Sequence, residues 1–298
     1  MDPWLTDETK ELFFQPCLEI SGHIARRLND WIRMGQTLSE PSLTEDFVEL
    51  FDTDSRSNVW GTALRELRDR NIYLRTNVRK AKAEHRVGAD IGLIVNRSIY
   101  EKGSLSCARY ACLIQCKKID EQGEVSDFYH VVKSSGKKQS TLMLDITSSS
   151  FYFLYVPSAL VKHYCNFEPI AFLRASPGCS VPVWNNGSFA FESVGMPFLS
   201  AKDKAEVVGV LVVPALAVEA QRRKGRGARL RDILPNCLPL WYWFSELLIP
   251  GFVGDRRDQV VGIAASPQDL SPNRESIFGV RYTLEITFGR EQRGKSIM

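Results

Sequence analysis

The sequence lacks an apolar run long enough to cross a lipid bilayer. Spanning helices need roughly 18 to 20 consecutive apolar residues. The longest candidates here, residues 207–218 and 237–253, are short or interrupted. The first residues, MDPWLTDETKELFF, also lack the basic segment and apolar core of a secretory signal. We therefore expect a soluble, cytoplasmic protein that has no membrane partner.

The cysteines lack the spacing of a disulfide framework or a zinc site. Seven cysteines form an odd set, which favours reduced thiols in a cytosol. Cys107, Cys112 and Cys116 come closest to a cluster, but paired CxxC motifs and matching distal ligands are missing. We expect these three side chains to be small buried residues rather than metal ligands.

The chain also lacks a strong excess of charge. Its formal net charge of +3 is compatible with a polyanionic partner without requiring one. The 298 residues are 44% hydrophobic, which is enough for a sizeable core. This composition excludes disordered and fibrous classes and leaves the number of domains open.

Apolar periodicity predicts two helices at the start of the chain. Residues 12–34 place apolar side chains at helical spacing. After the breaker-rich GQTLSEPS, the segment SLTEDFVELFD predicts a second helix with Ser42 or Thr44 as its N-cap. The polar sequence DTDSRSN then predicts a loop.

From residue 71 the pattern changes to short β-branched and aromatic runs, which are typical of strands. We predict strands at NIYLRTNV, GADIGLIV and RYACLIQCK, a helix in KKQSTLMLDITSSS, and a fourth strand at SFYFLYVP. Beyond residue 160 we expect a helix near 158–164 and strands at 206–213 and RYTLEITFG. The aromatic cluster at 241–244 indicates a core segment or a dimer contact, with a platform for stacking bases as the alternative. The whole pattern predicts an α/β protein.

Three polar residues fall at the ends of two of these predicted strands. Gln115 and Lys117 are two positions apart, so their side chains point to the same face. If GADIGLIV and RYACLIQCK pair as an antiparallel hairpin, Asp90 at the start of the first meets both at the end of the second. Asp90 and Gln115 would then offer oxygen ligands to Mg²⁺ or Mn²⁺, and Lys117 would stabilise charge on a phosphoryl group.

Other residues near this point have two interpretations each. Glu45, on the preceding predicted helix, is the candidate second carboxylate, with Glu49 as its competitor, or it simply complements the helix dipole. Lys118 and Gln139 would contact phosphate or face solvent. His85 would act near the metal or be a structural or solvated residue.

The sequences GADIGLIV and LIQCKK resemble the Asp…Gln-x-Lys signature of the PD-(D/E)XK nuclease superfamily. The element order resembles the αβββαβ core of these restriction-endonuclease-like proteins. An early Thr-Glu helix, the Gln-bearing helix and the strand FYFLY make the chain similar to poorly characterised bacterial members. The resemblance covers roughly residues 40–158.

The resemblance implies a restriction-endonuclease-like core with a mixed sheet flanked by helices, followed by a C-terminal α+β extension. Residues 1–40 would be an N-terminal helical segment, 41–160 the nuclease core, and 161–298 an accessory region. The implied activity is metal-dependent endonucleolytic hydrolysis of DNA, with RNA a less favoured substrate, in bacterial defence or genome maintenance. It assigns catalysis to Glu45, Asp90, Gln115 and Lys117, and binding of Mg²⁺ or Mn²⁺ to the first three.

The chain departs from the commoner signature because Gln, not Glu, stands at position 115. This leaves one negative charge fewer for a metal. The alternative function is therefore a non-catalytic protein that keeps the nuclease fold and binds nucleic acid or another protein. A homodimer remains open for either function.

A basic run, QRRKGRGARLR at 221–231, is the best local candidate for contacts with a nucleic-acid backbone. A solvated loop is the alternative for this run. The residues that we assign to nucleic-acid binding are polar or basic and come from three segments: Lys118, Gln139, Arg222, Arg223, Lys224, Arg226 and Arg229.

Overall fold

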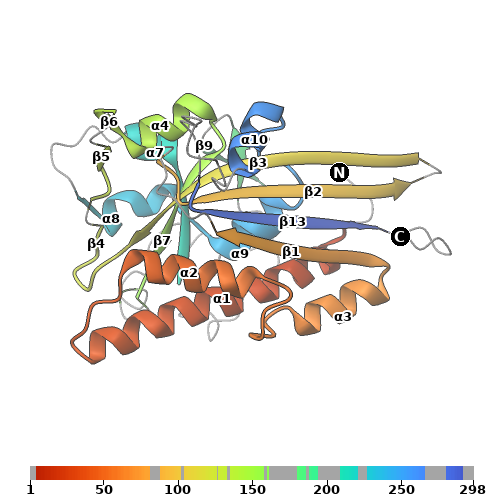
Figure 1. Cartoon of the computed structure of the whole chain (residues 1–298), viewed down its shortest axis with the longest axis horizontal. Coiled ribbons are helices and arrows are strands. Elements are labelled where there is room, and N and C mark those ends of the chain that lie inside the picture. Colours follow the sequence, from red (N-terminus) through yellow and green to blue (C-terminus); the bar gives the residue numbers. More distant parts are fainter. Residues whose placement is uncertain are drawn as a thin grey trace, which may run out of the picture.

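The computed structural model describes residues 5–80, 88–101, 104–125, 127–132, 135–157, 160, 180–185, 188–193, 209–220, 227–265 and 280–290. These residues form a mixed α/β protein in which a seven-stranded sheet is flanked by helices (Figure 1). The predicted α/β class is confirmed. None of the helices in these ranges combines the length and apolar character needed to cross a membrane.

The central sheet has the strand order β1-β13-β2-β3-β7-β10-β12. Its strands are β1 (Ile72–Lys80), β2 (Ile91–Glu101), β3 (Ser104–Lys118), β7 (Ser150–Tyr155), β10 (Val210–Pro214), β12 (Leu238–Pro239) and β13 (Tyr282–Arg290). The antiparallel pairing of β2 with β3 confirms the predicted hairpin. β3 and β7 run parallel, and the helix between them provides the crossover that parallel neighbours require.

Strand β13 comes from the far end of the chain and lies between β1 and β2. It pairs antiparallel with β1 and parallel with β2. Its first residue, Tyr282, is aligned with Ile91, the first residue of β2. Strands from beyond residue 160 therefore complete the same sheet that carries Asp90 and Gln115.

Helices α1 (Asp7–Arg33), α2 (Glu40–Phe51) and α3 (Gly61–Asp69) lie together on one side of the sheet (Figure 1). The capping prediction for α2 is wrong: the N-cap is Ser39, which accepts a hydrogen bond from the backbone N–H of Ser42. Pro41 is tolerated in the first turn, where a missing N–H breaks no helical bond. Helix α3 was not among the predicted elements.

Helices α4 (Gln139–Ile146), α7 (Ala215–Ala220) and α10 (Asp258–Ala265) lie on the opposite side (Figure 1). The predicted helix before β7 is confirmed as α4. Helix α10 comes very close to the sheet at Gly92, where an added Cβ would stand 2.3 Å from the carbonyl oxygen of Ala264. Only glycine leaves room for this contact.

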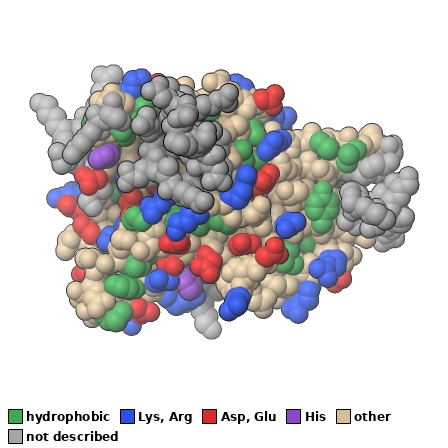
Figure 2. Space-filling model, in the orientation of Figure 1, with side chains coloured by type: hydrophobic (Ala, Val, Ile, Leu, Met, Phe, Trp, Pro, Cys, Tyr) green, Lys and Arg blue, Asp and Glu red, His purple; other side chains and the backbone are tan. Residues whose placement is uncertain are grey.

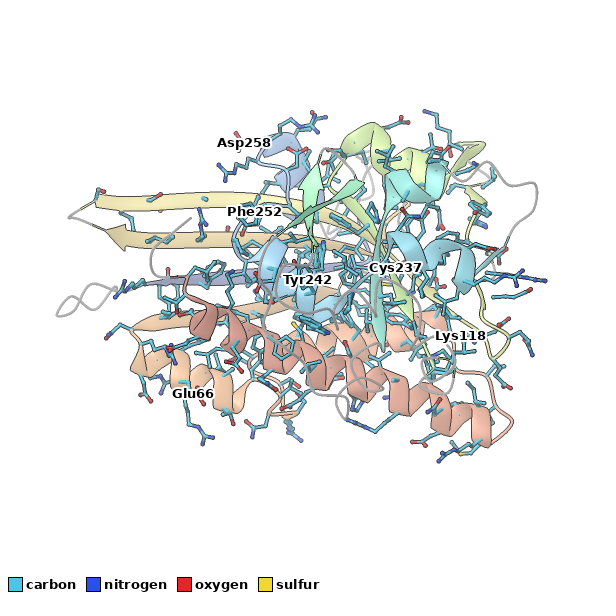
Figure 3. The ribbon with its side chains drawn as sticks, turned by 180° about the vertical axis from the view of Figure 1, so that it is seen from behind. Glu66, Lys118, Cys237, Tyr242, Phe252 and Asp258 are labelled. Carbon is cyan, nitrogen blue, oxygen red and sulfur yellow. The ribbon has the colours of Figure 1, made fainter. Side chains whose placement is uncertain are left out.

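The aromatic cluster at 241–244 lies in α9 (Leu240–Tyr242) and the π-helix η2 (Trp243–Leu248). All four side chains are buried, with Tyr242 inside the molecule in Figure 3. Trp243 packs edge-on against Phe151 and Phe153 of β7, with ring centroids 5.1 and 5.5 Å apart. The predicted core position of this cluster is confirmed.

Short elements fill the connections. They are β4 (Glu124–Val125), β5 (Val131–Val132), β6 (Lys137–Lys138), β8 (Ser180–Asn185), β9 (Ser188–Ser193), β11 (Ala228–Arg229), α8 (Leu230–Ile233) and the 3₁₀ helix η1 (Leu234–Asn236). Acidic and basic side chains are interleaved on the face drawn in Figure 2, in keeping with the small net charge of +3. Most of the predicted helix near 158–164 lies outside the described residues.

The cysteine predictions have a mixed outcome. Cys112 and Cys116 are buried in β3, as expected. The expectation is wrong for Cys107, which is exposed on the outer part of the same strand. The reason is that β3 extends beyond the helices that cover its other half, so its first residues are open to solvent.

Candidate active site

Asp90 and Gln115 meet where β2 begins and β3 approaches its end. The register places Ile91 opposite Ile114, so Asp90, one residue before β2, lies beside Gln115. Oδ2 of Asp90 accepts hydrogen bonds from Nε2 of Gln115 and, at 2.9 Å, from the backbone N–H of Cys116. The backbone is tied on both sides, since Asp90 donates to the carbonyl of Ile114 and accepts from the N–H of Tyr282, each at 2.8 Å.

The hydrogen bonds of Gln115 fix the orientation of its amide. Nε2 donates to Asp90 and also to the carbonyl oxygen of Cys116 at 3.1 Å. Both partners only accept hydrogen bonds, so the NH₂ group must face them and Oε1 must point elsewhere. Gln115 is only 2% exposed. Its Oε1 has no hydrogen-bond partner among the described residues.

The unpartnered Oε1 of Gln115 lowers the stability of the folded protein. A buried acceptor left without a partner costs roughly 1–3 kcal/mol relative to its hydrated state. Buried polar atoms are therefore satisfied in most proteins. The Gln115 oxygen is suited to a cation or to a donor group of a ligand.

Lys117 projects from the same face of β3 and meets an acidic residue that the sequence analysis missed. Lys117 is 5% exposed, and its Nζ lies 3.6 Å from Oε1 of Glu40. Burial raises the pKa of Glu40 to about 6, against the lowering effect of Lys117 and with a further raising effect from Asp90. Glu40 is thus the second carboxylate beside the Asp90–Gln115 pair.

The position of Glu40 follows from how α2 begins. It is the first residue of the helix, directly after the Ser39 cap. Lys118, labelled in Figure 3, donates from Nζ to the carbonyl oxygen of Leu38 at 3.0 Å, which ties the approach to α2 to the end of β3. The sequence signal for Glu40 was a Ser-Glu-Pro start, in which an acidic residue and a proline occupy the first turn.

Glu45 lies away from the group formed by Asp90, Gln115 and Lys117. It forms an ion pair with Lys80 at the end of β1, and both side chains are 52% exposed. Glu45 and Glu49 are four residues apart and share the exposed side of α2, whereas Thr44 and Phe47 face the sheet. The structure brings Asp90, Gln115 and Lys117 together, but not Glu45.

Gln139 lies close to this group, at the first position of α4. Its backbone packs against Gly88, where an added Cβ would stand 2.9 Å from the Gln139 carbonyl oxygen. Gly88 has a φ of +76°, which glycine adopts without strain. Oε1 of Gln139 is buried without a partner among the described residues. This is a second free amide oxygen at the same end of the sheet.

The remaining predicted binding residues are less informative. Arg229 lies on β11, 56% exposed, with its Nε 3.4 Å from Oε1 of Glu124. Lys118 is engaged with Leu38 rather than free in solvent. Four basic residues and one histidine of the sequence analysis fall outside the described residues: Arg222, Arg223, Lys224, Arg226 and His85.

The donor set suits a hard divalent cation. Glu40 and Asp90 offer carboxylates, and Gln115 and Gln139 offer amide oxygens, the ligand types that Mg²⁺ and Mn²⁺ prefer. No cluster of three or more His, Cys, Asp or Glu side chains suited to a metal occurs in the described part of the chain. A cation here would therefore depend on amide oxygens as well as carboxylates.

Comparisons of this chain with protein-family models, with curated proteins and with solved structures gave no match.

Proposed function

We propose that this protein is a metal-dependent phosphodiester hydrolase that cuts DNA, with Glu40, Asp90, Gln115 and Lys117 at its centre. The observation that carries the proposal is the buried, unpartnered Oε1 of Gln115, held beside Asp90 by a fixed amide. An oxygen in that position fits a cation ligand. The lysine two residues further supplies positive charge on the same face.

Asp90, Gln115 and Glu40 would hold Mg²⁺ or Mn²⁺. Such an ion, when bound, neutralises phosphoryl charge and lowers the pKa of a water molecule. Lys117, buried and close to the Glu40 carboxylate, would stabilise the negative charge that develops on the phosphate during attack. The hydrogen bond from the Cys116 N–H keeps the Asp90 carboxylate oriented towards Gln115.

The order of elements supports a restriction-endonuclease-like core. Helix α2, strands β1, β2 and β3, helix α4 and strand β7 follow one another as the resemblance implies, with α3 and short strands inserted. The insertion of β13 between β1 and β2 would be an addition to that core. We extend the proposal to a cytoplasmic role in bacterial defence, on the resemblance alone.

The test is cleavage of supercoiled plasmid by wild-type protein and by Asp90→Asn, Lys117→Ala and Lys137→Ala variants, in Mn²⁺, Mg²⁺ and EDTA. Lys137 is a matched control because it is 54% exposed and pairs with Asp145 on the surface. We expect metal-dependent cleavage by wild type and Lys137→Ala. The other two variants should lose about 100-fold or more in rate.

A second measurement separates the alternative function. Binding of a metal to the native state raises the melting temperature. Wild type should gain thermal stability with Mn²⁺ or Mg²⁺, and Asp90→Asn should not. If no variant cleaves and all melt alike at every metal concentration, a non-catalytic binding protein becomes the better description, as the Gln at position 115 would allow.

A further inference from the structure

Tyr152 lies on β7 directly beside Gln115. The parallel register of β3 and β7 pairs these two residues, so their side chains leave the sheet on the same face. Tyr152 is fully buried, and its ring packs against Phe128 with centroids 5.1 Å apart. The phenol therefore lies on the same face of the sheet as the Gln115 side chain, packed against Phe128.

The hydroxyl of Tyr152 has no hydrogen bond of ordinary geometry within the described residues. Its surroundings are nevertheless polar. Burial raises the pKa of Tyr152, the nearby Ser140 side chain lowers it, and the charges of Glu219, Asp90 and Glu40 raise it further. The hydroxyl therefore keeps its proton at neutral pH, and it lies within electrostatic reach of both carboxylates of the candidate site.

Ser140 cannot give its proton to Tyr152, because that proton is already engaged. The Ser140 hydroxyl donates to Oε2 of Glu219 on α7, and a carboxylate can only accept. Nζ of Lys138 lies 3.6 Å from the other oxygen of Glu219. The Ser140 oxygen can still accept a hydrogen bond, but the Tyr152 hydroxyl makes none of ordinary geometry with it.

A tyrosine without a partner is not what packing alone would favour at this position. Strand β7 reads SFYFLY, and a phenylalanine at 152 would fill the same space without burying a hydroxyl. A buried donor without an acceptor costs roughly 1–3 kcal/mol. The hydroxyl is explained if the acceptor belongs to a ligand.

We propose that Tyr152 is a substrate-binding residue whose hydroxyl donates a hydrogen bond to a non-bridging oxygen of the phosphate that the site engages. The inference rests on the proposed function and extends it to a strand that the sequence analysis treated as apolar. The Gln115 oxygen would bind the cation, and the Tyr152 hydroxyl would donate to a phosphate oxygen. Lys117 and a bound cation would offset the repulsion between phosphate and the carboxylates.

The test compares Tyr152→Phe with Tyr155→Phe. Tyr155 is the matched control because it is buried on the same strand but faces α2, where its hydroxyl hydrogen-bonds with that of Thr44 at 3.3 Å. Two readouts are needed: kcat and KM for cleavage of a duplex oligonucleotide in Mn²⁺, and binding of the same duplex in Ca²⁺. Melting temperatures report folding.

We expect Tyr152→Phe to lose about 10- to 100-fold in kcat/KM and at least tenfold in duplex affinity, the effect of one hydrogen bond to a charged oxygen. Its melting temperature should stay the same or rise. Tyr155→Phe should keep kcat/KM within about twofold and melt earlier, because it loses a satisfied hydrogen bond.

The outcomes separate the two proposals. If wild type cleaves and Tyr152→Phe matches it in both readouts, Tyr152 has no role in binding while the nuclease stands. A fall in melting temperature that accounts for all lost activity would also overturn the inference. If wild type binds the duplex without cleaving it, the binding comparison still decides the role of Tyr152. If wild type neither cleaves nor binds, both proposals fail together.

Discussion

The ammonium of Lys117 lies 3.6 Å from the carboxylate of Glu40, and the two side chains are only 7% and 29% exposed. This ion pair joins the end of β3 to the start of α2. Because burial keeps the pKa of Glu40 near 6, the charge of the candidate site changes close to neutral pH.

Replacing Glu40 should affect cleavage, whereas replacing Glu45 should not. Glu40→Gln removes the carboxylate beside Lys117 and Asp90, so we expect plasmid nicking in Mn²⁺ to slow by about tenfold or more. Glu45→Gln removes only an exposed ion pair with Lys80, so the rate should stay within about twofold. Equal effects of the two substitutions, or a larger effect of Glu45→Gln, would remove Glu40 from the site.

The pH dependence of stability should carry the signature of Glu40. Its pKa is about 6 in the folded protein against 4.5 in the unfolded chain, so the folded state binds the proton more tightly. The free energy of unfolding should therefore fall as pH rises from about 4.5 to about 6, by roughly 1–2 kcal/mol from this group. Above about pH 7, where Glu40 is ionised in both the folded and the unfolded state, this contribution should be constant.

Urea unfolding of wild type and Glu40→Gln in EDTA, at intervals from pH 4.5 to 7, measures this contribution. The difference between the two proteins isolates Glu40 from other titrating groups, among them Asp255, whose pKa is lowered by Arg257 against the effect of burial. Parallel pH profiles for the two proteins would contradict the assignment of the raised pKa to Glu40.

Gly92 in β2 and Gly262 in α10 should respond in opposite directions when each is replaced by alanine. Gly92→Ala would place a Cβ 2.3 Å from the Ala264 carbonyl oxygen, so the helix must move. We expect a loss of about 1–3 kcal/mol or more in the free energy of unfolding. Gly262→Ala, within α10, meets nothing within 4 Å and should gain about 0.5–1 kcal/mol from helix propensity. Urea titrations of both variants test the sign of each change.

Among the cysteines of β3, Cys107 should react fast with a thiol reagent and Cys112 should not. Cys107 is exposed, whereas Cys112 is buried and its burial raises the pKa of its thiol. In native protein at about pH 8, Cys107→Ser should remove one fast-reacting thiol per chain and Cys112→Ser none. Comparing variants removes the contribution of cysteines outside the described residues. If Cys107→Ser leaves the number of fast-reacting thiols unchanged, the outer part of β3 is covered in solution.

The sequence predicts those contacts of the site that join residues close together along the chain. Gln115 and Lys117 share a face because they are two apart in one strand, and Asp90 reaches them through a hairpin. These relationships need only neighbouring segments. The predicted N-cap of α2, Ser42 or Thr44, lies three or more residues after the observed N-cap, Ser39. Glu40 therefore fell outside the predicted helix, and Glu45 was its candidate carboxylate.

Tyr152 was missed for a different reason. Nothing in the apolar run SFYFLY distinguishes one tyrosine from the other. Tyr152 faces Ser140 and Glu219, while Tyr155 faces Thr44 and Cys116. Which side of β7 faces the site depends on its register with β3 and on α7, a helix from much later in the chain.

The sequence by itself determined the α/β class, the β2–β3 hairpin and the meeting of Asp90 with Gln115, because alternation and turns act between residues that are close along the chain. Only the tertiary structure decided that β13 enters the sheet between β1 and β2, and that Glu40 rather than Glu45 faces Lys117. These outcomes depend on pairing and burial between distant segments. Such contacts are selected by the packing of the whole core, and no local pattern records them.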